Sequence, residues 1–230
     1  YELLAGINPR LVYAAIRGFG DGRNGSSPYE AWPAYDVVAQ AMGGIMGITG
    51  PDAQSPMKIG PGVGDIFPGA LNAFAILAAV IHRQQTGQGQ HIDISMTDCV
   101  FALNAMAGAA ALAGGVEPHM QGTMLNGGSF YDYYRTADDR YLSVGSLEPQ
   151  FMLALAQAIG QPELAGLGLA QDSETQARLK QALQQTFASQ PLSHWQQLFA
   201  SLDACVEPVL SFSEAIRQPQ AQARQWVVQV

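Results

Sequence analysis

Leu11-Val12-Tyr13-Ala14-Ala15-Ile16 is a continuous run of β-prone residues, and the glycine-rich stretch Gly18-Phe19-Gly20-Asp21-Gly22 comes almost directly after it. An unbroken apolar run of this kind is typical of a strand that is buried on both faces of a parallel sheet. The glycines indicate a tight turn at the end of that strand. This stretch therefore favours a fold in which parallel strands alternate with helices.

The segments that follow alternate between helical and strand patterns. An apolar run from Ile66 to Ile81 predicts a buried helix, and Gly87 lies where that helix is expected to end. The expected elements are helices over about 34–46, 68–85 and 97–113, and short strands over Lys58–Val63 and His91–Ser95. This order predicts an α/β domain with parallel strands.

A change of composition follows residues 114–128, a loop that contains six Gly or Pro residues. Beyond it, Thr136-Ala137-Asp138-Asp139 indicates the turn of a hairpin, and Ser173 and Gln176 have the spacing of a capping box. The expected elements are strands over Phe130–Arg135, Arg140–Val144 and Cys205–Leu210, and helices over Pro149–Ile159, Ser173–Ala188 and Leu192–Ser201. We therefore predict a large domain over 1–113, a linker over 114–128 and a smaller α+β domain over 129–215.

Composition and charge exclude several classes of protein. The 230 residues are 48% hydrophobic and 13% charged, as in ordinary globular proteins, and they carry a net charge of -8. That charge argues against a general nucleic-acid binder, which needs a basic face for phosphates. The apolar run 66–81 is shorter than the roughly 20 residues of a membrane span, so no membrane association is expected. Two distant cysteines, Cys99 and Cys205, and the lack of a basic leader favour the cytoplasm.

Both ends of the chain lie close to apolar, strand-like patterns. The chain begins at Tyr1 without a methionine, and it stops on the run Trp226-Val227-Val228-Gln229-Val230 with no turn after it. We therefore expect this sequence to be the interior of a longer protein, in which the large domain has further residues before Tyr1.

Asp65 is the first candidate for chemistry, because it lies between the glycine-rich residues 60–64 and the predicted apolar helix. A carboxylate at a helix N-terminus meets free backbone N–H groups and the positive end of the helix dipole. The glycines before it would let a substrate approach the backbone closely. Such a carboxylate would be ionised, exposed and nucleophilic. An ordinary N-cap role for Asp65 is the alternative that the sequence leaves open.

Other chemistries lack their sequence patterns. Neither glycine-rich stretch has the full dinucleotide-binding pattern, and there is no P-loop and no G-x-S-x-G elbow. No metal is expected, because no metal-ligand spacing relates the histidines His82, His91, His119 and His194. Cys99 opens an apolar helix and is expected in the core. Glu148 before Pro149, like Tyr35-Asp36, has the pattern of an ordinary helix start.

Short motifs, in order along nearly the whole chain, resemble the family III CoA-transferases, the CaiB/BaiF group that also contains α-methylacyl-CoA racemase. The matching segments are Asn8-Pro9-Arg10-Leu11-Val12-Tyr13, Arg17-Gly18-Phe19-Gly20, Pro33–Gly44, Gly64-Asp65, Thr86-Gly87-Gln88-Gly89-Gln90 and Tyr141–Phe151. Each motif is short, and their common order and spacing make the resemblance specific.

This resemblance implies a Rossmann-like large domain, a smaller α+β domain and an interlocked homodimer. It implies that a segment before Tyr1 forms part of the CoA pocket, and that a C-terminal segment, which includes residues 216–230, returns to the large domain. The implied substrates are acyl-CoA and carboxylic acids, with no permanently bound cofactor.

The residue that matches Asp65 is the nucleophile of the transferases. The resemblance therefore implies that this carboxylate attacks an acyl-CoA thioester, passes through a mixed anhydride, and becomes an aspartyl-CoA thioester from which the acceptor carboxylate takes CoA. A glycine-rich loop shields these intermediates in the family, and Gly127-Gly128 is the candidate here. The residues expected to contact substrate or CoA are Tyr35, Asp36, Gly127, Gly128 and Glu148.

A racemase of the same family is the alternative. Racemases move a proton at the α-carbon with a His–Asp unit on one side and an Asp on the other, and that His would fall at position 35. The chain has Tyr35 there, and a phenol with a pKa of about 10 is a poor substitute for an imidazole of about 6.5. Residues 124–151 look more like the racemase branch, in which the acid that matches Glu148 tunes the His. A second alternative is an inactive fragment with a structural or partner-binding role.

Overall fold

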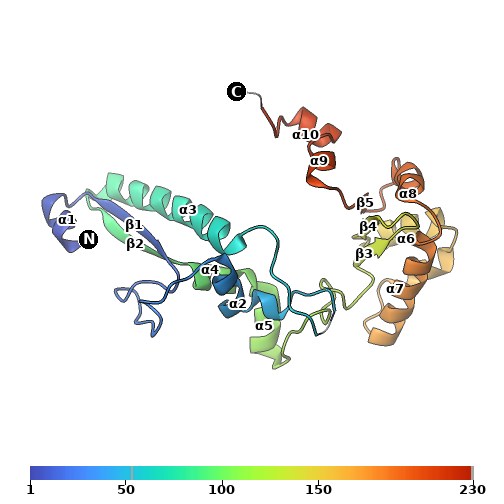
Figure 1. The fold of residues 1–230 in the computed structure, drawn as a ribbon, viewed down its shortest axis with the longest axis horizontal. Coiled ribbons are helices and arrows are strands. Elements are labelled where there is room, and N and C mark those ends of the chain that lie inside the picture. The colour runs from blue at the N-terminus through green and yellow to red at the C-terminus, as the bar shows by residue number, and fades with distance from the viewer. Residues whose placement is uncertain (53, 229–230) are drawn as a thin grey trace. The chain divides into compact units, whose positions relative to one another are not determined.

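The structure, a computed structural model, describes residues 1–52 and 54–228 of the chain (Figure 1). These residues form two compact units, Tyr1–Gly122 and Thr123–Val230, and we describe each unit by itself. The domain boundaries expected from the sequence remain predictions, because compactness alone defines the two units.

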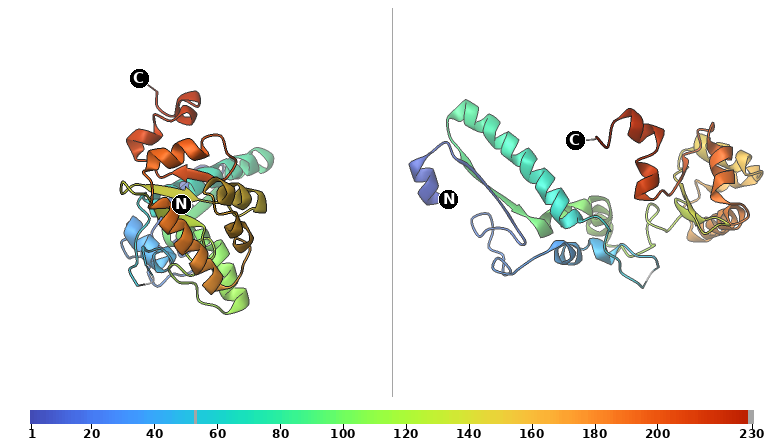
Figure 2. Two further views of the ribbon diagram at one scale, coloured as in Figure 1. Left: turned by 90° about the vertical axis from the view of Figure 1, so that its right-hand side faces the viewer. Right: turned by 45° about the horizontal axis from the view of Figure 1, so that its top comes forward.

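The first unit is built on two parallel strands, β1 (Val12–Arg17) and β2 (Gln90–Ser95), with Val12 opposite Gln90 and Arg17 opposite Ser95. This confirms the predicted α/β fold with parallel strands. The helix α3 (Val63–Thr86) connects towards β2 and packs along both strands (Figure 2). Gly87 ends α3 in the left-handed conformation, with φ of 77°, as its place after Thr86 predicts.

The prediction that residues 11–16 are buried on both faces is wrong for the described part of the chain. Tyr13 is 36% exposed and Ile16 is 44% exposed, although α3 covers part of the strand pair. The apolar run reflects the β-propensity of these residues. In the described part of the chain, the strand that they form is partly exposed.

Three other expected elements of this unit differ in the structure. The helix over 34–46 becomes α2 (Asp36–Met42) and the short helix η1 (Ile45–Gly47), because Gly44 between them has a positive φ of 84°. The strand over Lys58–Val63 does not form, and α3 begins at Val63 instead. The alanine-rich helix divides into α4 (Met96–Leu103) and α5 (Ala105–Gly114), which meet at 74°. Before β1, α1 covers Glu2–Ile7.

Helix α3 is longer than the apolar run within it suggested. Its 24 residues include a window of mean hydropathy 1.7, so by length and composition it could cross a membrane, as could the bent pair α4–α5. The expectation that this apolar segment is too short to span a membrane is therefore wrong. Mostly buried core helices of soluble proteins also meet this length and composition criterion. The apolar window of α3 is only 17% buried in the described residues, so the prediction of a buried helix is wrong, although α3 packs along β1, β2 and α4. Its other side exposes Ile66, Phe74, Leu77 and Ile81.

The second unit contains an antiparallel sheet with the order β3-β4-β5, made by β3 (Asp132–Arg135), β4 (Tyr141–Val144) and β5 (Val206–Pro208). The predicted hairpin is thereby confirmed. The helices of the unit are α6 (Pro149–Ala158), η2 (Pro162–Leu167), α7 (Ser173–Phe187), α8 (Leu192–Phe199), α9 (Phe212–Ala215) and α10 (Pro219–Ala223). Of the apolar run at the end, Trp226–Val228 forms no strand, and Gln229 and Val230 lie outside the described residues.

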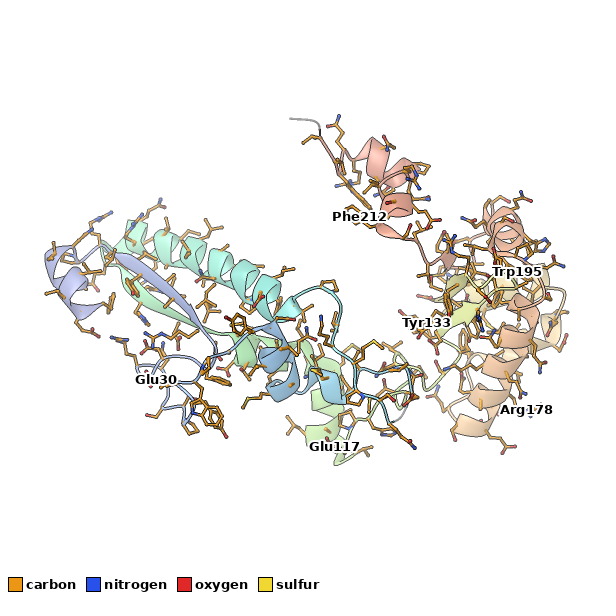
Figure 3. All side chains as sticks on the ribbon, viewed as in Figure 1. Glu30, Glu117, Tyr133, Arg178, Trp195 and Phe212 are labelled. Carbon is orange, nitrogen blue, oxygen red and sulfur yellow. The ribbon has the colours of Figure 1, made fainter. Side chains whose placement is uncertain are left out.

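Aromatic side chains fill the core of the second unit. Tyr134 and Phe187 are buried against each other, and Trp195 of α8 packs edge-on against Phe187. Figure 3 labels Trp195 in this unit. The polar atoms of this core have partners, because the Tyr134 hydroxyl donates to the Phe130 carbonyl at 2.5 Å and the Trp195 indole N–H donates to the Phe187 carbonyl at 3.0 Å. Burial raises the pKa of Tyr134, which keeps its hydroxyl a donor.

Gln176 has a different role from the capping box expected with Ser173. Asp172 is the N-cap of α7, and its carboxylate accepts the Thr175 N–H at 2.7 Å. The Gln176 side chain is buried instead, where it accepts the Phe130 N–H at 3.1 Å and donates to the Ala170 carbonyl at 2.7 Å. This amide ties the segment before β3 to α7.

Replacing Gln176 by Ala should destabilise the second unit by about 1–3 kcal/mol, because the Phe130 N–H would lose its buried partner. Urea denaturation of the intact protein, followed by tryptophan fluorescence, measures the change. Gln181→Ala on the exposed side of the same helix is the control and should stay within about 0.5 kcal/mol of the parent. Equal stability of the two variants would contradict the assigned role.

A capping box does occur at α9, between Ser211 and Glu214. The Glu214 carboxylate accepts the Ser211 N–H at 2.8 Å, and the Arg140 guanidinium donates to both of its oxygens at 2.9 and 3.0 Å. Hydrogen bonds from Ser211, followed by those from Arg140, lower the pKa of Glu214 from 4.5 to about 2. The ionised carboxylate therefore joins α9 to the start of β4.

Because the pKa of Glu214 is lower in the folded protein, its stabilising effect is present above the ordinary value of 4.5 and is lost as the pH falls towards about 2. Melting temperatures measured across this pH range should fall less steeply for Glu214→Gln than for the parent. The exposed Glu207, whose carboxylate has no partner among the described residues, supplies the control variant Glu207→Gln, which should follow the parent curve. Parallel curves for the parent and Glu214→Gln would contradict this assignment.

Candidate active site

Asp65 is the third residue of α3, in the first turn of the helix. The N-cap residue is Gly62, and the Asp65 N–H donates to the Gly62 carbonyl at 3.0 Å. The interpretation of Asp65 as the N-cap is therefore wrong. Its side chain is exposed, and no described residue makes a hydrogen bond or an ion pair with its carboxylate. The Asp65 carboxylate is thus exposed to solvent at the helix start.

The expected free N–H groups are not present at this helix terminus. The Val63 N–H donates to the Pro61 carbonyl at 2.7 Å, and the Gly64 N–H donates to Oδ1 of Asp36 at 2.8 Å. The acid that caps α3 is therefore Asp36, which lies at the start of α2. Since the cap comes from another helix, Asp65 need not turn back on its own backbone.

Asp36 is itself held by Gln40, one turn further along α2. The Gln40 Nε2 donates to both carboxylate oxygens of Asp36 at 2.9 Å, and Gln40 is 0% exposed. The other end of this amide accepts the Ile59 N–H at 2.8 Å. Asp36, Gln40 and Ile59 thus connect the starts of α2 and α3 through a continuous set of hydrogen bonds.

The structure brings Asp36 and Asp65 together around Gly62. A Cβ added to Gly62 would lie 3.5 Å from Oδ2 of Asp65 and 3.8 Å from Oδ1 of Asp36. Tyr35, the N-cap of α2, comes directly before Asp36 and is 77% exposed. The first unit therefore gathers three predicted site residues, two acids and a phenol, at the neighbouring starts of two helices.

The other predicted site residues, Gly127, Gly128 and Glu148, belong to the second unit. Gly127 has a positive φ of 76°, and its carbonyl accepts the Lys180 ammonium at 2.8 Å. Lys180 also pairs with Asp132, so one cation from α7 joins the glycine loop to β3. The Gly128 N–H donates to the Thr123 carbonyl at 2.9 Å, which closes the loop on itself.

Glu148 is the N-cap of α6, followed by Pro149 at the first helical position, as the sequence predicts. Its carbonyl accepts the N–H groups of Phe151 and Met152, both at 3.0 Å. The side chain makes no cap hydrogen bond and is exposed, so the capping role of this acid belongs to its backbone. The carboxylate is available for another contact.

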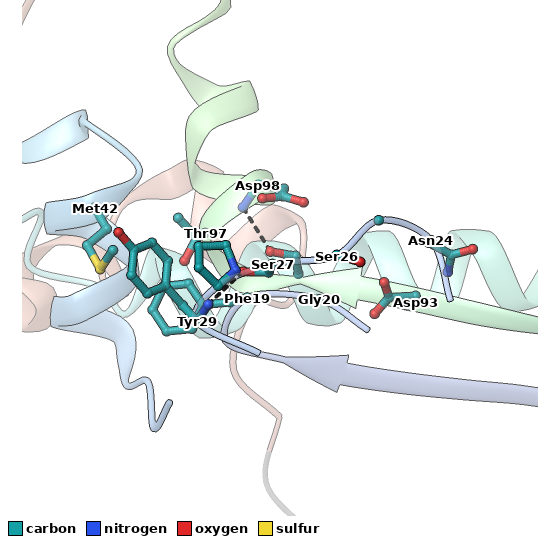
Figure 4. Close-up of a pocket in the computed structure, with 13 residues that line it drawn as sticks. Phe19, Gly20, Asn24, Ser26, Ser27, Tyr29, Met42, Asp93, Thr97 and Asp98 are labelled. Carbon is teal, nitrogen blue, oxygen red and sulfur yellow. Dashed lines mark hydrogen bonds between the residues drawn. The ribbon is translucent and has the colours of Figure 1, made fainter. Parts of the chain in front are cut away.

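A pocket of about 600 Å³ lies in the first unit, beside the carboxyl ends of β1 and β2 (Figure 4). Its lining includes Phe19, Tyr29, Met42, Asp93, Thr97 and Asp98, and none of the predicted site residues. Asp93 accepts the Asp21 N–H at 2.9 Å, and with Asp98 it gives the pocket an acidic lining unsuited to phosphate groups. The sequence indicated only a glycine turn here.

Cys99 lies in the core, as expected. Burial, followed by the charge of Asp98, raises the pKa of its thiol, which disfavours the nucleophilic thiolate. Within the part of the chain that the structure describes, no cluster of three His, Cys, Asp or Glu side chains could hold a metal ion.

Fold and site together define an α/β protein with an exposed carboxylate in the first turn of the helix that precedes the parallel strand β2. The sequence model of CoA-transferase family III matches residues 1–230. The chain belongs to this family.

The named relatives include a CoA-transferase and a racemase. The chain is 41% identical over 165 residues to a succinyl-CoA:mesaconate CoA-transferase of Haloarcula marismortui, which covers 72% of the chain and 41% of the relative. It is 32% identical to the α-methylacyl-CoA racemase of Homo sapiens, over 94% of the chain and 56% of the relative. The chain thus spans about half the length of these relatives.

The fold has a close counterpart among solved structures. A CAIB/BAIF family protein from Brucella suis superimposes with a TM-score of 0.79 at 30% identity, over 97% of this chain and 59% of that protein. The α/β arrangement of the chain is therefore that of the family.

Replacing Gly64 by Ala should disturb the start of α3, because the new Cβ would lie 3.0 Å from both the carbonyl and Oδ1 of Asp36 and 3.1 Å from Cβ of Ala39. We expect a loss of about 1–3 kcal/mol in the free energy of unfolding, measured by urea denaturation. Gly69→Ala is the matched control in the same helix, where nothing lies within 4 Å of the added atom. That variant should be neutral or up to about 1 kcal/mol more stable. Equal effects would show that the contact at Gly64 is unimportant.

Proposed function

We propose that the protein transfers CoA between carboxylic acids through a covalent intermediate on Asp65. Membership of CoA-transferase family III and the CoA-transferase among its relatives support the class of reaction. The observation that carries the residue assignment is the exposed Asp65 carboxylate, which has no partner among the described residues at the start of α3. A nucleophile in this state needs no bond within the protein to break before it attacks.

The proposed reaction proceeds in balanced steps. A carboxylate oxygen of Asp65 attacks the thioester carbonyl, and the C–S bond breaks to give a mixed anhydride and the CoA thiolate. The thiolate then attacks the aspartyl carbonyl, which forms the aspartyl-CoA thioester and releases the donor carboxylate. The acceptor carboxylate then attacks the aspartyl carbonyl of this thioester, and the C–S bond breaks to give a second mixed anhydride and the CoA thiolate. The thiolate attacks the acceptor carbonyl of that anhydride, which forms the new acyl-CoA and releases the Asp65 carboxylate. Each step is an acyl transfer, so no oxidant or metal is required.

We propose supporting roles for the other predicted residues, each within its own unit. Tyr35, exposed beside Asp36, would contact the substrate. In the second unit, Glu148 would bind substrate or CoA, since its side chain does not cap α6. The loop at Gly127-Gly128 would be the shielding loop that the family resemblance implies, and Lys180 holds its backbone.

We propose that the intact protein has a Rossmann-like large domain and a smaller α+β domain, and that it is an interlocked homodimer. The apolar side chains exposed on α3 and α5, such as Phe74 and Leu112, support an assembly that covers them. The free cysteines Cys99 and Cys205 fit a reducing, cytoplasmic compartment.

Racemisation at the α-carbon is the second candidate, favoured by the likeness to the human racemase. It would need Asp65 and a second base on the other side of the substrate. Tyr35 stands where the resemblance places the racemase His, and a phenol is a weaker proton shuttle. Position 35 therefore favours transfer.

Asp65→Ala in the intact protein should abolish CoA transfer and cost only about 0.3–1 kcal/mol in stability, because a first-turn acid contributes little beyond its interaction with the helix dipole. Incubation with acyl-CoA and hydroxylamine, followed by peptide mass spectrometry, should modify Asp65 in the parent. Asp98→Ala is the matched control, since Asp98 is exposed at the same position of α4. It should retain transfer.

Two results would overturn the transferase assignment. One is near-parental transfer by Asp65→Ala. The other is the absence of any Asp65 adduct together with deuterium exchange at the α-carbon of the substrate, which would establish racemisation instead.

A further inference from the structure

The start of α3 depends on a side chain from another helix. Its N-cap residue is a glycine, which has no side chain to accept an N–H, and the acceptor for the second N–H of the helix is Asp36 of α2, 28 residues earlier. An unpartnered N–H at a helix start is costly when water is displaced, as it would be under a bound substrate. Asp36 therefore keeps this turn helical when the site is occupied.

Gln40 determines how Asp36 can point. The Gln40 Oε1 is committed to the Ile59 N–H at 2.8 Å, and its Nε2 also approaches the Ile59 carbonyl at 3.3 Å. An inverted amide would lose these bonds, so the Nε2 group must face Asp36, where it bonds to both oxygens. The amide is fully buried and has no solvent to replace a lost partner. Gln40 thus holds Asp36 in the orientation that caps Gly64.

The same two side chains hold both ends of the glycine segment before Asp65. Gln40 binds the backbone of Ile59 and Asp36 binds the backbone of Gly64, while the residues between, 60–62, form no regular structure. At Gly64 the two helix starts touch, since an added Cβ would meet Asp36 atoms at 3.0 Å. Asp65 is the next residue, so its backbone position follows from this contact.

We propose that Asp36 is a positioning residue for Asp65, with Gln40 as its support, and not the substrate-binding residue expected from the sequence. The inference rests on the proposed nucleophilic role of Asp65. Asp36 acts through the Gly64 N–H: it fixes the first turn of α3 and leaves the Asp65 carboxylate free to attack. Its loss should therefore reduce the rate of the chemical step more than the affinity for acyl-CoA.

Asp36→Ala and Asp36→Asn in the intact protein test this role. Asp36→Ala should lower kcat by about 100-fold through misplacement of the nucleophile, with KM for acyl-CoA within about 3-fold of the parent. Asp36→Asn keeps an oxygen that can accept the Gly64 N–H, but its amide nitrogen faces the Gln40 Nε2 donor, so it should recover only part of kcat. A rise in KM at unchanged kcat would show that the carboxylate acts on substrate directly and would overturn the proposal.

Hydrogen–deuterium exchange of the peptide that contains Gly64 gives a readout that does not depend on activity. Exchange should accelerate in Asp36→Ala and Gln40→Met, less so in Asp36→Asn, and it should stay near the parental rate in Gln85→Met, a control at an exposed glutamine of α3. Unchanged exchange in Asp36→Ala would overturn the positioning role even if Asp65 forms its adduct.

If Asp65 is not the nucleophile, the same experiments give a different set of results. In that case Asp65 forms no adduct in the parent, while exchange at Gly64 still responds to Asp36→Ala and not to Asp65→Ala. The two hypotheses can therefore be rejected separately.

Discussion

The hydrogen bond from the Gly64 N–H to Asp36 is the interaction on which the arrangement of the site depends. A helix must satisfy the N–H groups of its first turn, and α3 begins on a glycine that cannot do so itself. Asp36 supplies the acceptor from α2, and a Cβ at position 64 would press on Asp36 at 3.0 Å where the two turns meet. Because the cap comes from elsewhere, Asp65 retains an exposed carboxylate without a partner among the described residues.

Two acids that are close in space therefore have opposite environments. Asp36 accepts hydrogen bonds from a backbone N–H and from a buried amide, whereas Asp65 faces solvent. In the second unit, helix side chains also bond to the backbone of irregular segments: the buried amide of Gln176 binds the backbone before β3, and Lys180 binds the loop at Gly127. In both units, side chains from helices fix the irregular segments that carry the candidate site residues.

Elements with a local cause were predictable from the sequence, and elements with a distant cause were not. The parallel strands, the end of α3 at Gly87 and the hairpin of β3 and β4 follow from propensity and turn chemistry. A short strand is expected from the sequence over Lys58–Val63, yet the backbone of Ile59 pairs with the side chain of Gln40. The helix after β2 ends early at Asn104, whose side chain donates to the Gly43 carbonyl at 2.8 Å.

By itself, the sequence determined the α/β class, the hairpin of β3 and β4 and the presence of an acid at the start of the apolar helix, because these depend on neighbouring residues. It could not determine which acid caps that helix and which remains free. That choice depends on a contact between α2 and α3 across 28 residues, with a buried glutamine to orient it. Only the tertiary structure brings these groups within hydrogen-bonding distance, and so it alone decided that Asp36 supports the helix while Asp65 is left exposed.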